Sequence, residues 1–217
     1  IHYTLENGMN VIIKPTKTYN DAVIIKGIAA GPAKKYDVAY KIANQMGKSG
    51  GCGAYSNAEL MKILAGKSVT FNTSIVKKQR AFTSYVTPDD IETSFQLIHH
   101  LFTTSTSSNA TYKQALKEKL LYAPSLFKKY ATTNSLKKVA YKAAQRYLTS
   151  FEKPSDFTIY IVGAFDSKKM QTLIQHYLAS IPSTSKKQLL IANTSLGNIS
   201  LDQCIQQNNT KDTPHDK

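Results

Sequence analysis

Phe157-Thr158-Ile159-Tyr160-Ile161-Val162, followed by Gly163-Ala164-Phe165-Asp166, is the stretch that decides the fold. Its first six residues are apolar or β-prone, as in a strand, and the glycine begins a turn. Asp166 is a common helix N-cap residue, and Pro182 ends the helix that follows. The apolar residues of this helix fall on one face: Met170, Leu173, Ile174, Tyr177, Leu178 and Ile181. A strand that leads into such a helix is typical of an α/β or α+β domain.

The composition favours a globular domain with a basic surface. The chain has 217 residues, enough for a substantial core, and a formal net charge of +14. Lysine supplies nearly all of this charge, because Arg80 and Arg146 are the only arginines. Phosphate and base recognition rely on the planar guanidinium of arginine, so this balance argues against nucleic-acid binding, although the field favours acidic partners. No apolar run approaches the roughly 20 residues that cross a bilayer.

Strand and helix signals elsewhere complete the predicted fold class. Asn7-Gly8 between two apolar runs predicts an opening hairpin, and residues 22–30 predict a third strand. Residues 69–75 alternate in polarity, and residues 81–86 are their expected antiparallel neighbour. Helices are expected over 36–46, with Tyr36, Tyr40, Ala43 and Gly47 along one side, and over 135–148. The prediction is an α+β domain in which helices pack on one face of a mixed, largely antiparallel sheet.

Local motifs do not indicate a phosphate or metal site. The glycine-rich loop over 47–53 follows a helix and lacks the Gly-Lys-Ser/Thr ending of a P-loop. The histidines at 2, 99, 100, 176 and 215 form no pair at metal-ligand spacing, so surface or boundary roles are favoured. A zinc site made within this chain is therefore not expected.

The two cysteines, Cys52 and Cys204, lie far apart in different sequence contexts. They allow one disulfide but no disulfide framework, and they do not reveal the redox compartment. Cys52 has no base near it in sequence, and a plain loop cysteine is the favoured interpretation. A nucleophile assembled across the fold stays open, because catalytic groups need not be sequence neighbours.

Three segments, in order, resemble the pitrilysin/insulinase family of zinc peptidases. They are Leu5-Glu6-Asn7-Gly8-Met9-Asn10-Val11-Ile12-Ile13-Lys14-Pro15-Thr16, then Glu59-Leu60 with Leu64-Ala65-Gly66-Lys67-Ser68-Val69, and finally Ile161-Val162-Gly163-Ala164-Phe165-Asp166 within 156–182. The resemblance is strongest to a repeat of the C-terminal, non-catalytic half of the bacterial members. The segment between Leu121 and Leu136 is shorter than the helical segment of the family.

The resemblance implies where catalytic residues would stand in an active repeat. The family carries an inverted His-x-x-Glu-His motif on its first helix, in which the histidines bind zinc and the glutamate activates water. In this sequence Tyr40 and Asn44 stand at the histidine positions, and Ala43 stands at the position of the base. Glu118, between Lys117 and Lys119, falls near a later glutamate that completes the family's site, whereas by itself it is a solvated helix residue. These identities predict no catalytic, metal-binding or cofactor-binding residue in the chain.

The resemblance implies a scaffold function. Family members fold as paired α+β halves that close around an extended peptide, so we expect this chain to be a non-catalytic half or fragment that encloses the peptide chamber with a zinc-bearing half. Zinc is then expected in the partner half, on the same or another chain. Two alternatives stay open: a stand-alone lysine-rich module that binds an anionic partner, and a decayed, inactive fragment.

The domain layout follows from the same patterns, and the resemblance alone implies a location. Residues 1–183 are predicted to form the peptidase-like domain, and residues 184–217, rich in Ser, Thr, Asn, Gln and Lys, a polar linker or tail. The chain begins at Ile1 within a strand-like pattern, as a segment of a longer protein would. Exported bacterial relatives point to the periplasm or cell envelope.

Overall fold

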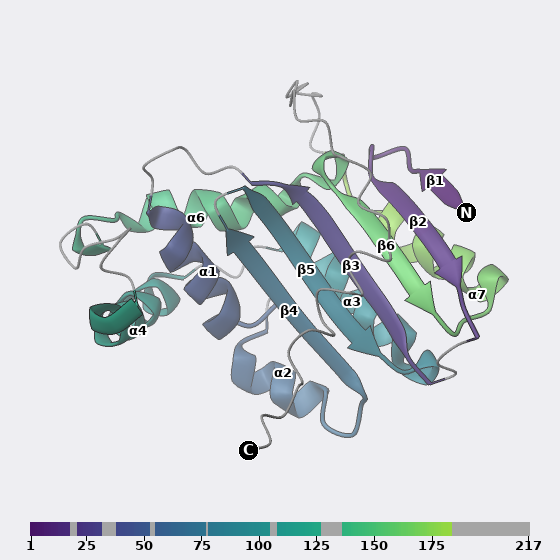
Figure 1. Ribbon diagram of the computed structural model, residues 1–217, viewed down its shortest axis with the longest axis horizontal. Helices are drawn as coiled ribbons and strands as arrows, with labels where there is room; N and C mark the ends of the chain where they lie inside the picture. Colours follow the sequence, from purple (N-terminus) through teal and green to yellow (C-terminus); the bar gives the residue numbers. More distant parts are fainter. Residues whose placement is uncertain are drawn as a thin grey trace, which may run out of the picture. The chain divides into compact units, whose positions relative to one another are not determined.

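A six-stranded sheet lies at the centre of the computed structural model, which describes residues 1–17, 21–31, 38–52, 55–76, 78–104, 108–126 and 136–183 (Figure 1). The strand order is β1-β2-β6-β3-β5-β4. The strands are β1 (His2–Thr4), β2 (Asn10–Pro15), β3 (Val23–Ala30), β4 (Val69–Val76), β5 (Gln79–Val86) and β6 (Thr158–Gly163). Only the β2–β6 pair is parallel in this sheet, so the predicted mixed, largely antiparallel sheet is confirmed.

The helices of the described part of the chain pack on one face of the sheet. They are α1 (Ala39–Ser49), α2 (Asn57–Ile63), α3 (Ile91–Thr103), α4 (Asn109–Leu126), α6 (Tyr141–Leu148) and α7 (Ser167–Leu173), with a π-helical turn η4 (Ile174–Ala179). Short 3-10 turns lie at η1 (Pro88–Asp90), η2 (Thr149–Glu152) and η3 (Pro154–Asp156). Figure 1 shows α3 and α7 behind the sheet.

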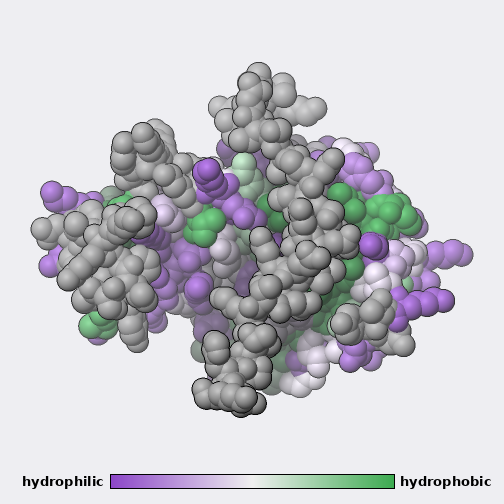
Figure 2. Space-filling model, in the orientation of Figure 1, coloured by the Kyte–Doolittle hydropathy of each residue, from purple (hydrophilic) through white to green (hydrophobic). Residues whose placement is uncertain are grey.

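Alternating burial along the strands marks the face that the helices cover. In β3, Val23, Ile25 and Ala29 are buried, whereas Ile24 on the other face is 41% exposed. Tyr85 of β5 pairs with Ile24 across the open face and is 54% exposed. Figure 2 views the molecule from this side and shows apolar side chains, in green, gathered over part of it. The core therefore lies between the sheet and the helices, as predicted.

A buried asparagine joins the opening turn to the closing helix. Asn7 is 5% exposed, and its Nδ2 donates hydrogen bonds to the carbonyls of Leu178 at 2.7 Å and Ile181 at 3.1 Å. Its Oδ1 accepts from the amide of Met9 at 3.2 Å. The Asn-Gly turn also needs Gly8, whose φ is +84°. The first and last motifs of the resemblance thus contact each other directly.

The β6–α7 unit has the predicted form. Gly163 has a φ of +142°, and a Cβ there would lie 2.3 Å from the carbonyl oxygen of Ala22. Asp166 caps α7, because its carboxylate accepts from the amide of Lys169 at 2.8 Å. The predicted apolar stripe is buried apart from the partly exposed Tyr177. The sequence pattern does not predict the change from α-helix to π-helix at Ile174.

The first predicted helix needs a correction in position and face. It runs from Ala39 to Ser49, and its buried residues are Ala39, Ile42, Ala43 and Met46. Tyr40 lies at the border of this stripe, while residue 36 lies outside the described residues. The helix also continues through Gly47 instead of ending there. A Cβ at Gly47 would lie 2.9 Å from Oγ1 of Thr73, so this glycine permits the close approach of α1 to β4.

The predicted helix over 135–148 is interrupted: residues 136–137 are helical, residues 138–140 are not, and α6 begins at Tyr141. Ala140 has an extended ψ of 147°, and the carbonyl of Val139 accepts from the hydroxyl of Tyr112 at 2.5 Å. A contact with α4 therefore replaces a helical hydrogen bond at this point. The predicted tail over 184–217, Cys204 and His215 lie outside the described residues, so the domain boundary stays a prediction.

Candidate functional site

The three positions that the resemblance assigns to the zinc motif lie on α1 with different surroundings. Ala43 is fully buried in the core. Tyr40 is partly buried, and its ring meets Tyr147 edge-on with 6.4 Å between centroids. Asn44 uses its Oδ1 to accept the amide of Ile75 in β4 at 2.8 Å. Each side chain thus has a packing or hydrogen-bonding role, and their assignment to the motif stays a prediction.

The Asn44 bond covers part of a sheet edge. β4 is the last strand of the sheet, so every second residue directs its backbone N–H and C=O away from β5. The amide of Ile75 is one of these outward groups, because it donates to α1. Asn44 therefore ties the first helix to the edge strand, a role that its sequence context does not reveal.

Glu118 of α4 lies against α1, beside the presumed motif positions. Its Oε2 accepts from Nε2 of Gln45 at 2.5 Å and from the hydroxyl of Ser49 at 3.4 Å. Its Oε1 accepts from Nε2 of Gln114 at 3.0 Å. The structure thus brings Glu118 to the helix that the resemblance paired it with, and neutral donors hold both of its oxygens.

A small cavity opens between these elements. It has a volume of about 230 Å³ and is lined by Tyr40, Lys41, Asn44, Ile75, Val76, Lys119 and Leu136. Burial and the nearby Lys119 lower the pKa of Lys41. Burial and Lys48 lower the pKa of Lys119, while Glu118 acts in the opposite direction. We call this space, defined by its seven lining residues, the α1–β4 pocket.

The donors around the α1–β4 pocket do not fit zinc. Protein zinc sites use thiolates, imidazoles and carboxylates, whereas Tyr40 offers a phenol and Asn44 an amide oxygen that already holds Ile75. The ammonium groups of Lys41 and Lys119 also oppose a divalent cation. Within the described ranges, no group of three or more His, Cys, Asp or Glu side chains could hold a metal ion.

Sequence reasoning missed the two lysines of this pocket. Lys41 and Gln45 are four residues apart, and Ser49 follows four residues later, so the three share the side of α1 near α4. That spacing could have indicated a polar helix interface. The convergence of Lys41 with Lys119 depends on how α1 and α4 pack, which no local pattern encodes.

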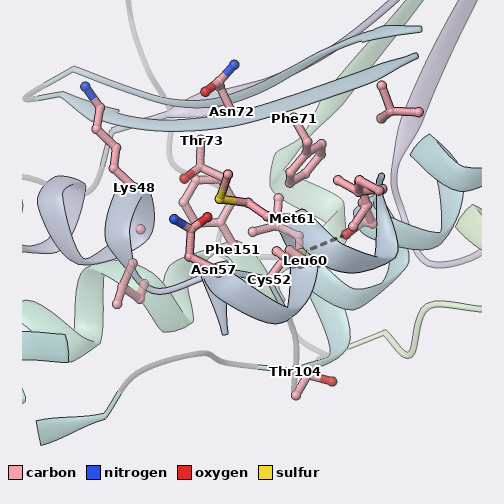
Figure 3. Close-up of a pocket in the computed structure, with 17 residues that line it drawn as sticks. Lys48, Cys52, Asn57, Leu60, Met61, Phe71, Asn72, Thr73, Thr104 and Phe151 are labelled. Carbon is pink, nitrogen blue, oxygen red and sulfur yellow. Dashed lines mark hydrogen bonds between the residues drawn. The ribbon is translucent and has the colours of Figure 1, made fainter. Parts of the chain in front are cut away.

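A second, larger cavity of about 470 Å³ lies between α2, β4 and α3 (Figure 3). Figure 3 shows α2 with Asn57 and Leu60 on one side and β4 with Phe71 and Thr73 on the other. No residue of α2 is buried, and Met61 is 70% exposed. A capping box between Ser56 and Glu59 holds the start of this helix. The cavity is therefore open beside α2, and both apolar and polar side chains line it.

Cys52 lies in the wall of this cavity as a buried thiol. It is 4% exposed, and its Sγ donates to the carbonyl of Leu97 at 3.2 Å. Burial raises the pKa of the thiol to about 12, so it stays protonated at neutral pH. Because the thiolate is the reactive form, this environment opposes the nucleophile that the sequence left open.

The histidines near the end of α3 form an aromatic surface cluster. The His99 ring meets His100 and Tyr177 edge-on, at centroid distances of 6.3 and 6.5 Å. Burial, His100 and His176 lower the pKa of His99. His176 is exposed, rather than lying at the border of the core as its sequence position predicted.

Comparison with known proteins identifies a curated relative of clear similarity. No protein-family model matches the chain. The chain is 29% identical over 190 residues to a protein described as "Zinc protease PQQL-like" from Arabidopsis thaliana. The alignment covers 82% of this chain but 19% of that protein, so the chain spans about a fifth of the relative's length.

Solved structures share the fold at low sequence identity. A protease from Helicobacter pylori superposes with a TM-score of 0.69 and 13% identity, over 86% of this chain and 51% of that chain. The periplasmic protease PqqL from Escherichia coli gives a TM-score of 0.68 and 23% identity, over 86% of this chain and 23% of that chain. The ferredoxin protease FusC superposes with a TM-score of 0.60 and 16% identity, over 83% of this chain and 23% of that chain. The chain therefore has a pitrilysin/insulinase-like fold, as its motifs predicted.

Proposed function

We propose that this chain is a non-catalytic part of a pitrilysin/insulinase-like zinc peptidase, which encloses a peptide-binding chamber together with a zinc-bearing half. One observation carries the proposal: most of the chain aligns with a protein described as a zinc protease, yet it spans only 19% of that protein. A segment of this size with its own buried hydrophobic core is what one part of a multi-repeat peptidase would supply.

The chemistry of α1 supports a non-catalytic role. A peptidase of this family needs two zinc ligands and a base on its first helix. Here the proposed equivalents are a phenol, a methyl group and an amide, at Tyr40, Ala43 and Asn44. None of these can abstract a proton from water at neutral pH. Hydrolysis would therefore belong to the zinc of the partner half, and this chain would supply the wall that confines the peptide.

The test compares the purified chain with a mixture of the chain and the zinc-bearing half encoded with it. Cleavage of an unstructured fluorogenic peptide and bound zinc by mass spectrometry are measured for both samples. We expect no turnover by the chain alone and turnover by the mixture, which fails when the partner's His-x-x-Glu-His motif is mutated. Turnover by this chain alone would overturn the proposal.

Two further measurements, cleavage by the zinc-bearing half alone and titration of the chain with an anionic polymer, separate the alternatives left by the sequence. A stand-alone binding module predicts tight binding of an anionic polymer that weakens steeply with salt, and no effect on the zinc-bearing half. If the chain is a decayed fragment, it should neither bind the anionic polymer tightly nor change cleavage by the zinc-bearing half. Faster cleavage when the chain is added supports the enclosing role over both.

A periplasmic or cell-envelope location is part of the proposal. It rests on the resemblance to exported peptidases and on the description of the structural relative PqqL as periplasmic. Fractionation of the native host, with the protein detected by antibody, tests it. Recovery in the cytoplasmic fraction would contradict it.

A further inference from the structure

We infer that the contact between η4 and α3 is a pH-sensitive switch: the neutral ring of His99 lets η4 pack on α3, and protonation of His99 beside two further histidines releases it. The inference does not depend on the proposed function, because it concerns how the domain holds its closing helix. Its basis is a row of three imidazoles at the place where one tyrosine joins the two elements.

Tyr177 is the side chain that joins η4 to α3. Its hydroxyl donates to Oε1 of Glu92 at 2.7 Å and accepts from Nε2 of Gln96 at 3.3 Å. Its ring packs against Phe95 and His99, with 6.3 and 6.5 Å between centroids. These four residues of α3 are spaced three to four positions apart, so they form one ridge of the helix. The tyrosine lies along this ridge, and His99 forms the end of it.

The groups that face His99 from both elements become cationic in acid. On η4, His176 follows the same side of the contact, and its ring meets Tyr177 edge-on at 4.6 Å. On α3, the ring of His100 lies 6.3 Å from that of His99 and also meets Tyr55 edge-on at 5.7 Å. Histidines gain their charge between about pH 5 and pH 8, so acid places like charges on both sides of the contact.

The electrostatics give the direction of the switch. Glu92, the carboxylate of this contact, precedes His99 by two helical turns and already accepts from Tyr177. Burial, His100 and His176 lower the pKa of His99, which means that the packed state favours the neutral ring. The stabilisation of the contact is therefore complete above the ordinary histidine pKa of 6.5, and it is lost as the pH falls below this value.

The opposite side of the closing helix is held by groups that do not titrate. The amide of Asn7 donates to the carbonyls of Leu178 in η4 and Ile181 just after it. Acid should therefore loosen η4 on the α3 side while the link to the opening turn stays. A π-helical turn, which is rare in proteins and frequent at functional sites, occupies this position.

The experiment measures hydrogen exchange of the η4 amides in the full chain at about pH 7.5 and about pH 5.5. Rates are corrected for the pH dependence of intrinsic exchange, and the amides of β6 serve as the internal reference. The test variant is His99→Gln, which stays neutral at both pH values. The matched control is His2→Gln, at an exposed position of β1. Circular dichroism checks that both variants are folded.

In wild type and His2→Gln, protection of the η4 amides should fall about tenfold between the two conditions, because the released state binds one more proton over the unit below pH 6.5. Protection in β6 should stay constant, and His99→Gln should lose most of the fall in η4. Unchanged protection in wild type, or the same fall in His99→Gln, would overturn the inference.

Two further results guard against a misleading variant. An equal fall in η4 and β6 would overturn the inference, because it shows global acid unfolding instead of local release. If His99→Gln does not fold, NMR titration of the wild-type His99 imidazole decides: a midpoint below 6.5 supports the switch, and a midpoint at or above 6.5 overturns it. The proposed function is tested separately, by cleavage.

Discussion

The β6–α7 unit and helix α1 pack against the same sheet, yet they differ in how far their residues match the family-like pattern. In β6–α7, the buried stripe, the Gly163 turn and the Asp166 cap all match the family-like pattern. In α1, the buried stripe is equally complete, whereas the positions that the resemblance assigns to chemistry hold Tyr40, Ala43 and Asn44. Two of the three presumed motif positions, 40 and 44, lie beside the buried stripe, whereas Ala43 lies within it, so the packing of α1 does not require catalytic residue types at these positions.

The physical basis is the angular separation of residues on a helix. Ile42, Ala43 and Met46 point into the core, and substitution there would cost packing energy. Tyr40 and Asn44 lie at the border of that stripe, where aromatic packing and one hydrogen bond suffice. Packing therefore depends more strictly on the first set than on the second.

Removing the buried aromatic ring of Phe157, next to β6, should have the largest effect on stability. Phe157 is 1% exposed and packs against Phe82, Phe102 and Phe151. Phe157→Ala should lower the free energy of unfolding by about 4 kcal/mol, measured by urea denaturation. Tyr85→Ala on the open face is the control, and a loss below about 1 kcal/mol for Phe157→Ala would contradict the assigned core.

Cutting the link between the first and last motifs should come next. Asn7→Ala removes hydrogen bonds to Leu178, Ile181 and Met9, and it leaves buried carbonyls without a donor. We expect a loss of about 3 kcal/mol in the free energy of unfolding. Asn10→Ala removes only an exposed bond with Thr4 and should cost far less. Similar losses in the two variants would show that the buried link is not important.

Loss of the Asn44 side chain tests whether this residue of α1 has a structural role. Asn44→Ala removes the acceptor of the Ile75 amide, so the free energy of unfolding should fall by about 1 kcal/mol. Asn72→Ala is a matched control, because Asn72 is an exposed residue of β4, the strand that contains Ile75. Equal stability of the Asn44 variant and the wild type would rule out a structural role for this side chain.

Tyr40→Phe should have the smallest effect. The ring keeps its edge-on contact with Tyr147, so the free energy of unfolding should change by less than about 0.5 kcal/mol. Tyr40→Ala, which also removes the ring, should cost more. If the two variants lose equal stability, the hydroxyl rather than the ring is the important group, and our account of this position is wrong.

Local sequence signals were sufficient for one of the two regions. The strand, turn, cap and stripe of β6–α7 are all encoded within 157–182, so they could be predicted. The course of α1 could not, because the glycine-rich sequence from Gly47 predicts a loop, whereas Gly47 lies within the helix, close to Thr73 of β4. The Asn7 bond to Leu178 joins residues 171 positions apart. The proximity of Lys41 to Lys119 arises from the packing of α1 against α4. Resemblance placed Glu118 near α1, and only the structure gives its three donors.

Calorimetric titration of the purified chain with zinc tests the central claim, that α1 keeps the fold without the metal chemistry. Wild type and Glu118→Gln are titrated in parallel at neutral pH, since Glu118 would be the remaining carboxylate ligand beside α1. The account predicts that the two proteins give the same curve, with no tight one-to-one site. Tight one-to-one binding by wild type that Glu118→Gln abolishes would contradict it.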